Sequence, residues 1–432
     1  MALPTAAPLD YERAEVVRHF RRNYAAHSLE GGLFIGGLAL VHPQTIAPRL
    51  IERLGGPDWA IAAAPVLLML GFFIPSLFIT HRLERLRFLK PFIMWLGVLQ
   101  RLPYLLVGLS LLFVQQADHG TLALVVLAPL LSGLAGGVSI TAWREYVAKS
   151  IPREKRASLW AIRFVLGGLL GVVAGRIVEQ VLDHHAEMRA YGLLHLGVFL
   201  CMMGSYAVFA LTREPNLTSA RPSAERDWWG YARSMRRIIA NDARLPAYLG
   251  CRALYSGLFV VLPFLTLRAL EVLKAGDGYL GRLLMFQMLG SVLGNLAGGV
   301  LGDRGGGRNV LLLAQAGSVV VAATSPALHS AFAFEALFFA LGLAVGLGSV
   351  GVATLDVEMS GFDQRMSYQT LIGLSHLLGM IGAVVIATTV RRYTSSFAVL
   401  AWIAAGLMLG SLLLLSPLPE PRRWRTSPTD PA

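Results

Sequence analysis

The stretch Phe397–Leu415 reads FAVLAWIAAGLMLGSLLLL and contains no charged residue. As a helix that rises about 1.5 Å per residue, it is long enough to cross the roughly 30 Å hydrocarbon core of a bilayer. Trp59–Ile79 and Leu122–Thr141 are uncharged windows of similar length. Core helices of soluble proteins are rarely so long and uninterrupted, so these windows predict helices that span a membrane.

Hydropathy along the whole chain extends this pattern. The 432 residues are 55% hydrophobic and 15% charged, with a mean hydropathy of +0.58, whereas an ordinary soluble domain is about 25% charged. We therefore predict an all-α polytopic membrane protein with twelve transmembrane helices in two six-helix bundles. The spans are placed at 24–47, 59–80, 91–115, 121–143, 158–182, 191–211, 246–269, 279–301, 310–327, 331–355, 367–390 and 396–416.

One long polar segment divides the two halves. It contains Pro215, Pro222 and a run of arginines, and its aromatic residues Trp228, Trp229 and Tyr231 predict an amphipathic helix on the membrane surface. The predicted domains are a cytoplasmic N-terminal segment at 1–22, a bundle at 23–211, a cytoplasmic linker at 212–245, a second bundle at 246–418 and a cytoplasmic tail at 419–432.

The net charge of +12 lies almost entirely between the apolar runs. Most Lys and Arg residues fall in alternate loops on one side, together with both termini and the linker. Positively charged loops stay cytoplasmic, so we expect a multi-pass protein of the inner (plasma) membrane with both termini in the cytoplasm. No nucleic-acid motif accompanies the charge. Residues 1–22 mix acids with arginines and precede no cleavage site, so we expect the first span to be retained.

Motifs of other functional classes are missing from the sequence. There is no serine-nucleophile elbow, no HExxH pair and no Walker string. Cys201 and Cys251 lie in apolar stretches without metal-ligand spacing. We therefore expect no enzyme activity, no cofactor and no metal site, and an energy source in an ion gradient or in the solute's own gradient.

The most specific short motif ends the eighth span, where residues 299–308 read GVLGDRGGGR, which fits G-x-x-x-D-R-x-G-x-R. It resembles the cytoplasmic-loop signature of the major facilitator superfamily, at the corresponding place in the second half of the chain. The resemblance implies a permease that works by alternating access and a conformational-switch loop. The loop residues are Gly299, Asp303, Arg304, Gly306 and Arg308, with Glu84 and Arg85 as a degenerate counterpart in the first half. The alternative for the latter two is an ordinary positively charged loop.

Glycines recur every four residues along two spans. They are Gly167, Gly171 and Gly175 in span five, and Gly290, Gly294 and Gly298 in span eight. Such spacing puts glycines on one helix face and permits close backbone approach. In the superfamily that the chain resembles, these two helices meet between the bundles, so we expect inter-bundle contacts there. The alternative is that glycine is simply common in membrane helices.

Two departures from the family pattern argue against a drug/proton antiporter. Residues 171–177 of span five lack the proline that the resembling antiporters carry, and residues 131–137 of span four lack an arginine before the Gly-rich turn.

Polar residues within the spans are the candidates for solute or ion binding, because a charge inside a bilayer is costly unless it faces a cavity or a partner. They are Arg101, His376, Tyr255, Glu30, Arg252, Asn295 and Gln287. Arg101 is suited to an anionic solute and His376 to a proton or a hydrogen bond. The alternatives are a structural buried histidine and, for Glu30, Arg163 and Arg252, charges at helix ends. Arg176 and Glu179, three residues apart, are expected to pair.

These observations favour a secondary transporter that moves a small solute across the membrane as a monomer in the bilayer, coupled to protons, to another ion or to neither. The alternatives are a sensor or scaffold that keeps the permease fold and a membrane-embedded lipid-modifying enzyme.

Overall fold

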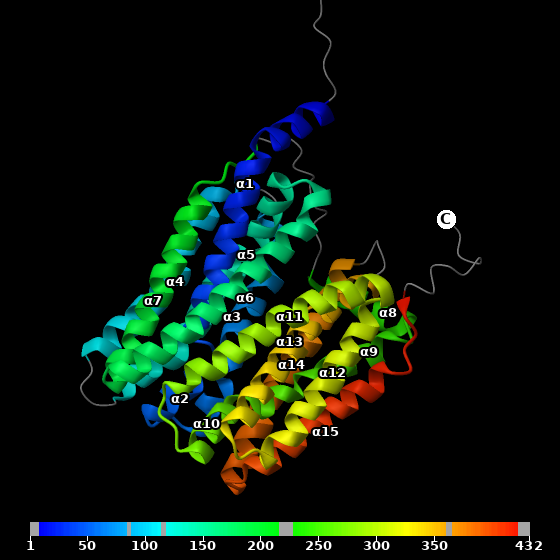
Figure 1. Ribbon diagram of the computed structural model, residues 1–432. Helices are drawn as coiled ribbons and strands as arrows, with labels where there is room; N and C mark the ends of the chain where they lie inside the picture. The colour runs from blue at the N-terminus through cyan, green and yellow to red at the C-terminus, as the bar shows by residue number, and fades with distance from the viewer. Residues whose placement is uncertain (1–7, 84–87, 114–117, 216–227, 360–364, 422–432) are drawn as a thin grey trace, which may run out of the picture. The chain divides into compact units, whose positions relative to one another are not determined.

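The computed structural model describes residues 8–83, 88–113, 118–215, 228–359 and 365–421, and within these ranges the secondary structure is entirely helical (Figure 1). The α-helices are α1 (Pro8–Ala39), α2 (Ala47–Arg53), α3 (Asp58–Leu83), α4 (Lys90–Phe113), α5 (His119–Ser150), α6 (Arg153–His184), α7 (Glu187–Ala210), α8 (Trp228–Asn241), α9 (Leu245–Tyr255), α10 (Leu262–Leu273), α11 (Tyr279–Gly305), α12 (Gly307–Thr324), α13 (Ala331–Met359), α14 (Arg365–Tyr393) and α15 (Phe397–Leu415). Two short 3₁₀ helices, η1 (Ser256–Val260) and η2 (Ser325–Ala327), follow α9 and α12. The prediction of an all-α chain is confirmed.

Among the described residues, 11 helical segments are long and apolar enough to span a membrane. They match the predicted spans from the second onward. The first predicted span, 24–47, needs a correction, because its helix α1 already begins at Pro8 and ends at Ala39. The helix stops there because Pro43 disfavours helical backbone at the residue before it. Glu30 and the arginines near its start leave α1 less apolar than the other spans.

The seventh predicted span is a broken helix. α9 ends at Tyr255, five residues of 3₁₀ helix follow, and α10 begins at Leu262 with Pro263 in its first turn. Proline suits the first turn of a helix, because the N–H that it lacks would have no partner within the helix there. Inside a longer helix, the same proline would remove a backbone hydrogen bond and clash with the preceding turn. Broken helices are tolerated in membranes where other protein groups satisfy the freed backbone.

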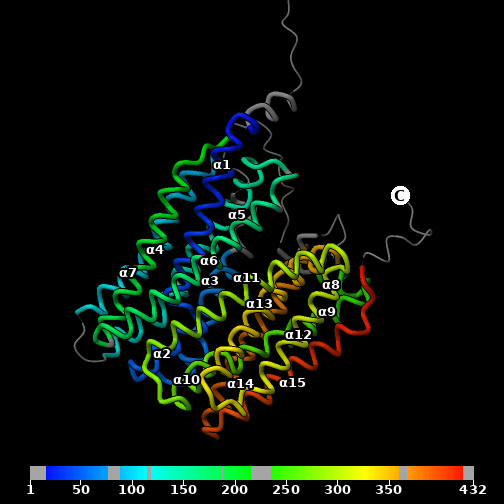
Figure 2. Tube along the Cα trace, in the orientation of Figure 1, coloured from blue at the N-terminus to red at the C-terminus, as the bar shows by residue number. Residues whose placement is uncertain are grey.

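Packing divides the chain into two compact units. The first comprises residues 1–40, 67–171 and 187–225, and the second comprises 41–66, 172–186 and 226–432. Thus Val41–Val66 and Val172–Ala186, which the sequence assigns to the first bundle, pack with the second unit. The traces of Figure 2 allow the chain to be followed through each unit in turn.

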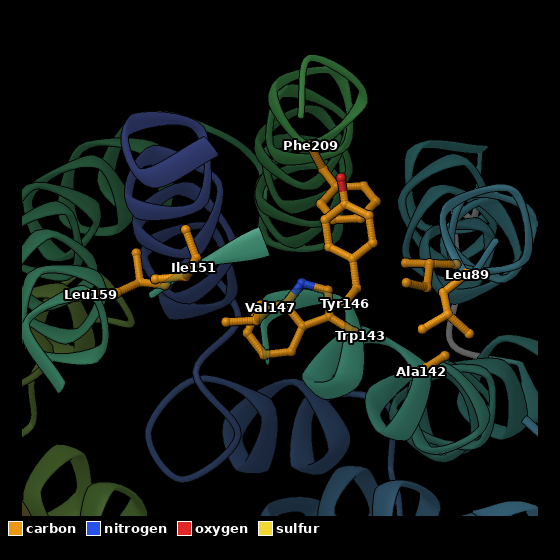
Figure 3. Close-up of a cluster of buried hydrophobic side chains, with 9 residues drawn as sticks. Leu89, Ala142, Trp143, Tyr146, Val147, Ile151, Leu159 and Phe209 are labelled. Atoms are coloured by element: carbon orange, nitrogen blue, oxygen red, sulfur yellow. The ribbon is translucent and has the colours of Figure 1, made fainter. Parts of the chain in front are cut away.

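In the first unit, α4 packs against α5 and α7, and α1 packs against α7. α3 and α5 approach closely at Gly71 and Gly133, because a Cβ on Gly133 would lie 2.9 Å from the Cα of Gly71. At one end of the unit, an apolar cluster joins Trp143 and Tyr146 of α5 to Phe209 of α7 (Figure 3). The rings of Tyr146 and Phe209 lie side by side, with centroids 5.3 Å apart. This cluster fixes α5 against α7 beside the cavity described below.

In the second unit, α11 and α13 are the most closely packed helices. A Cβ on Gly294 would lie 3.0 Å from the carbonyl carbon of Leu343, and one on Gly346 would lie 2.8 Å from the nitrogen of Asn295. Side chains at these positions would hold the two backbones apart, so glycine here permits close approach.

This packing corrects the prediction that the span-eight glycines line an inter-bundle contact. Gly290, Gly294 and Gly298 face α13, because their hypothetical Cβ atoms meet Phe339, Leu343 and Val350. Gly167 of span five faces Ile35 of α1. The four-residue spacing correctly predicts a contact face, but it does not specify the partner helix.

Gly175 does meet α11, as predicted for that position. A Cβ added to it would lie 2.8 Å from the carbonyl oxygen of Gly281. The partner of Gly175 on α11 is therefore Gly281, near the start of the helix, and not one of the predicted glycines at 290, 294 and 298.

The linker contains the predicted amphipathic helix as α8. Its residue Ile238 is buried and packs with Leu245 of α9 and with Tyr368 and Leu371 of α14. The side chains of Trp228, Trp229 and Tyr231, on which the membrane-surface prediction rests, lie outside the side chains that the structure describes.

Candidate functional site

The first unit contains a cavity of about 200 Å³ between its helices. It lies among α1, α3, α4, α5, α6 and α7. Its charged lining residues are Glu30, Arg101 and Arg163, and its other polar groups include Gln100 and Ser139. Two of the predicted candidates, Glu30 and Arg101, thus meet at one site.

Glu30 of α1 and Arg163 of α6 form a buried ion pair on the cavity wall. Nη1 of Arg163 donates to Oε2 of Glu30 and also to the carbonyl oxygen of His27, at 2.5 Å for the latter. The two side chains are 10% and 7% exposed, which removes the carboxylate and the guanidinium from most of the surrounding solvent. Gly31 permits this arrangement, since a Cβ at that position would collide with the Arg163 guanidinium.

Arg101 of α4 is buried and held by backbone oxygens. Its Nε donates to the carbonyl of Met202 at 2.7 Å, and its Nη1 donates to the carbonyl of Gly97 at 2.6 Å. Gly97 and Arg101 are four residues apart, so they share one face of α4. In the part of the chain that the structure describes, no carboxylate forms an ion pair with Arg101.

Aromatic rings cover both guanidinium groups. The Arg163 guanidinium carbon lies 4.6 Å from the ring centroid of Trp143 and 5.6 Å from that of Trp160. The Arg101 guanidinium carbon lies 5.2 Å from the ring centroid of Tyr206. An aromatic face attracts a cation through its quadrupole, so these rings stabilise the charged guanidinium groups.

Sequence reasoning missed several parts of this site. It regarded Arg163 as a charge at a helix end, and it assigned no role to Trp143, Trp160 or Tyr206. Tryptophan and tyrosine are common near membrane interfaces, so their presence alone carries no signal of a site. The spacing of Trp160 and Arg163, three residues apart on α6, was the available hint that they share a face.

The second unit holds the other predicted candidates. Arg252 of α9 faces Asp356 of α13, with 3.7 Å between Nε and Oδ1, and the Tyr248 hydroxyl donates to the same carboxylate at 2.5 Å. The Arg252 guanidinium carbon lies 5.9 Å from the ring centroid of Tyr255. Together these contacts join α9 to α13.

The Nδ1 of His376, on α14, lies 2.8 Å from the hydroxyl oxygen of Ser256. The same hydroxyl donates to the backbone carbonyl of His376 at 3.0 Å. His376 therefore has a hydrogen-bond partner at the break between α9 and α10. This satisfied environment fits the structural alternative, and a role in solute binding remains a prediction.

Gln287 and Asn295 both lie on α11. The Oε1 of Gln287 accepts a hydrogen bond from the Thr45 hydroxyl at 2.8 Å, which ties α11 to the segment before α2. Asn295 donates to the carbonyl of Ser291, one turn earlier on its own helix, at 2.9 Å.

The GVLGDRGGGR segment comprises the end of α11, Gly306 and the first two residues of α12. Gly306 has a φ of +82°, which only glycine adopts readily, and it separates the two helices. The N–H of Gly307 donates to Glu358 of α13 at 3.3 Å, and Arg308 donates to the carbonyl of Ser416 at 2.5 Å. The first-half counterpart, Glu84 and Arg85, lies outside the described residues.

An ion pair on α6 and the possible metal ligands were also considered from the sequence. Arg176 and Glu179 form the expected pair at 2.6 Å, which confirms that prediction. Within the described ranges, no group of three or more His, Cys, Asp or Glu residues is arranged to hold a metal ion.

Comparisons with known proteins agree on one architecture. The family description "Sugar (and other) transporter" matches residues 264–429. The crystal structure of a D-xylose-proton symporter is similar with a TM-score of 0.70 and 11% identity, over 93% of this chain and 98% of that one. The crystal structure of the nucleoside transporter NupG is similar with a TM-score of 0.65 and 13% identity, over 91% of this chain and 98% of that one. No curated protein sequence matches. These likenesses confirm the predicted architecture of two six-helix bundles.

Proposed function

We propose that this chain, which has the fold of the major facilitator superfamily, is a secondary transporter that binds a small solute in the cavity of its first unit. Transporters of this kind bind their solute near the middle of the membrane and expose it to either side in turn. The broken helix at η1 and the glycine-mediated contacts provide segments that can adjust during such a cycle.

The buried pair of Glu30 and Arg163 is the observation that carries the proposal. Buried charged groups in a membrane protein are expensive and mark solute pathways or proton relays more often than structural contacts. Here both charges line a cavity instead of a packed core. A carboxylate that accepts a proton releases its arginine partner, so protonation of Glu30 would change what Arg163 can bind. We therefore infer coupling of solute movement to protons at this pair.

The predicted topology places both termini in the cytoplasm. The charge distribution between the spans supports it, because the termini, the linker and the segments 81–90, 144–157, 303–309 and 359–366 together carry 26 of the 38 Lys and Arg residues.

The test is solute uptake into proteoliposomes that contain the purified full-length chain. Vesicles are prepared with an inward proton gradient and supplied with radiolabelled D-xylose, uridine or benzoate. We expect accumulation of one of these solutes above the level in protein-free vesicles, and this excess should collapse when an ionophore removes the gradient.

Two variants assign the coupling. Glu30→Gln should lose gradient-driven accumulation of that solute while it retains exchange of labelled for unlabelled solute. Glu179→Gln, which removes the carboxylate of a pair with the largely exposed Arg176, should behave like the unmodified protein. A folded protein that neither accumulates nor exchanges any of a wide range of sugars, nucleosides and carboxylates would favour the sensor or scaffold alternative.

A further inference from the structure

We propose that the solute of this cavity is a small carboxylate anion with a flat, single-ring apolar body. This inference rests on the proposed function, because it takes the cavity of the first unit as the solute site. It is carried by three features of that cavity: its charge, an unsatisfied donor and its walls.

The charge of the cavity is unbalanced. Two arginines and one glutamate line it, and the one carboxylate pairs with Arg163. Arg101, which is only 5% exposed, contacts neutral carbonyl oxygens. Burial of an uncompensated cation is unfavourable, so an anion of one charge that enters the cavity would be attracted there. A neutral sugar would leave the imbalance in place.

Arg163 offers the anion a free donor. Its Nε is buried and has no hydrogen-bond partner among the described residues, while its Nη1 is shared between Glu30 and His27. A guanidinium presents its N–H groups in a planar fork that matches the two oxygens of a carboxylate. This Nε lies against Gly31 at the cavity wall, and a solute carboxylate that reached it would supply the acceptor that it lacks.

The walls and size of the cavity define the rest of the solute. Trp143, Trp160, Phe34, Phe72 and Tyr206 surround the polar groups, and aromatic rings pack favourably against flat apolar bodies. A cavity of about 150 Å³ is enough to hold a benzene ring. The cavity here, at about 200 Å³, accommodates one ring with a carboxylate attached.

The test measures binding without transport. Isothermal titration calorimetry on the detergent-purified full-length chain, at constant ionic strength, compares sodium benzoate with its neutral analogue benzamide and with D-xylose. We expect benzoate to bind at least about tenfold more tightly than benzamide, since a hydrogen bond to a charged group is stronger than one between neutral groups. Similar affinities for benzoate and benzamide, or tighter binding of D-xylose, would overturn the inference.

Three variants locate the site. Arg163→Gln should abolish the preference for benzoate over benzamide. Glu30→Gln should raise the benzoate affinity about tenfold, because it removes the carboxylate that competes for Arg163, and should leave benzamide binding unchanged. Arg176→Gln, on the same helix but with a side chain that is 60% exposed, should match the unmodified protein. If Arg163→Gln does not fold, Glu30→Gln decides the question, because it should raise the affinity for benzoate and not that for benzamide. A fall in benzoate affinity would contradict the proposal.

The outcomes separate the two proposals. Benzoate binding without uptake of any solute would overturn the proposed transport and support the carboxylate site. Uptake of D-xylose or uridine by a protein that does not bind benzoate would support transport and overturn the carboxylate site.

Discussion

In the part of the chain that the structure describes, a buried arginine-carboxylate pair lies in each unit, and the two pairs have different surroundings. The Glu30–Arg163 pair of the first unit lines a cavity and lies beneath two tryptophan rings. The Nε of its arginine has no hydrogen-bond partner among the described residues, and the same holds for the Nε of Arg252 in the second unit. In the second unit, Asp356 faces Arg252 and also accepts a hydrogen bond from Tyr248, and its backbone carbonyl accepts one from Gln369 at 2.8 Å. The lining of the first-unit cavity includes neither Arg252 nor Asp356.

This difference indicates that a buried charge in a membrane helix can have a structural or a functional role. The second pair joins α9, α13 and α14 and is surrounded by the apolar cluster of Tyr248, Cys251 and Leu355, so we expect it to act as a structural connection. The first pair has open space beside it, so we expect it to act on a solute. Variants of the two pairs test this contrast, and two further experiments test the packing and the helix cap that support the units.

The largest effect is expected from removal of one partner of the second pair. Arg252→Met leaves the Asp356 carboxylate buried without its cation, and we expect a loss of about 3–5 kcal/mol in the free energy of unfolding. Adding Asp356→Asn to the Arg252→Met variant should restore most of the lost free energy of unfolding, because the buried charge is removed and the amide oxygen still accepts a hydrogen bond from Tyr248. Denaturant unfolding of the purified proteins measures the stability of the single and the double variant. Solute uptake by the double variant should persist.

The corresponding double variant of the first pair is the matched comparison. Glu30→Gln with Arg163→Met should fold with similar stability but lose solute binding. The distinction between the two pairs would be wrong if the folded Arg252→Met/Asp356→Asn variant lost uptake. It would also be wrong if the Glu30→Gln/Arg163→Met variant retained benzoate binding.

A smaller effect is expected at the glycine contacts that both units use. Gly342→Ala places a Cβ 2.8 Å from the carbonyl carbon of Gln287 in the second unit, and Gly133→Ala places one 2.9 Å from the Cα of Gly71 in the first. Overpacking of this kind costs about 1–3 kcal/mol, so we expect both variants to unfold at lower denaturant concentration. Gly382→Ala, with no atom within 4 Å of the added Cβ, is the control and should not lose stability. Unchanged stability in one of the two variants would mean that its unit does not depend on close backbone approach at that position.

The smallest effect is expected at Asp118, which caps α5, the helix that carries Trp143 to the cavity. The backbone N–H and the hydroxyl of Thr121 donate to its carboxylate and lower the pKa of Asp118 from its ordinary value of 3.8. Because the folded pKa is lower than the unfolded one, the stabilisation is present above about pH 4 and is lost as the pH falls through the folded value.

Asp118→Ala should therefore lower the Tm at pH 7, and the difference should disappear in strong acid. Asp118→Asn, which still caps the helix, should keep most of the stability and show no such pH dependence. A difference between Asp118→Ala and the unmodified protein that persisted at low pH would contradict this account.

How far the candidate site could be predicted depends on the residue. Glu30 and Arg101 were found because a charge within an apolar window is unusual whatever its neighbours are. Arg163 was misjudged because its distance from the end of the span suggested that it could reach solvent, whereas its guanidinium folds back toward α1. The glycines of α11 were recognised as a contact face, but the face meets α13.

The sequence by itself determined that the chain is helical and spans a membrane, because an uncharged window of about 20 residues satisfies its own backbone hydrogen bonds in lipid as a helix. It also located the Gly-rich motif at 299–308 and the charges within the apolar windows. Only the tertiary structure decided which helices meet and which charges line a cavity. Contacts between residues such as Glu30 and Arg163, which lie far apart in the chain, depend on how helix faces pack, and hydropathy contains no information about the partner of a face.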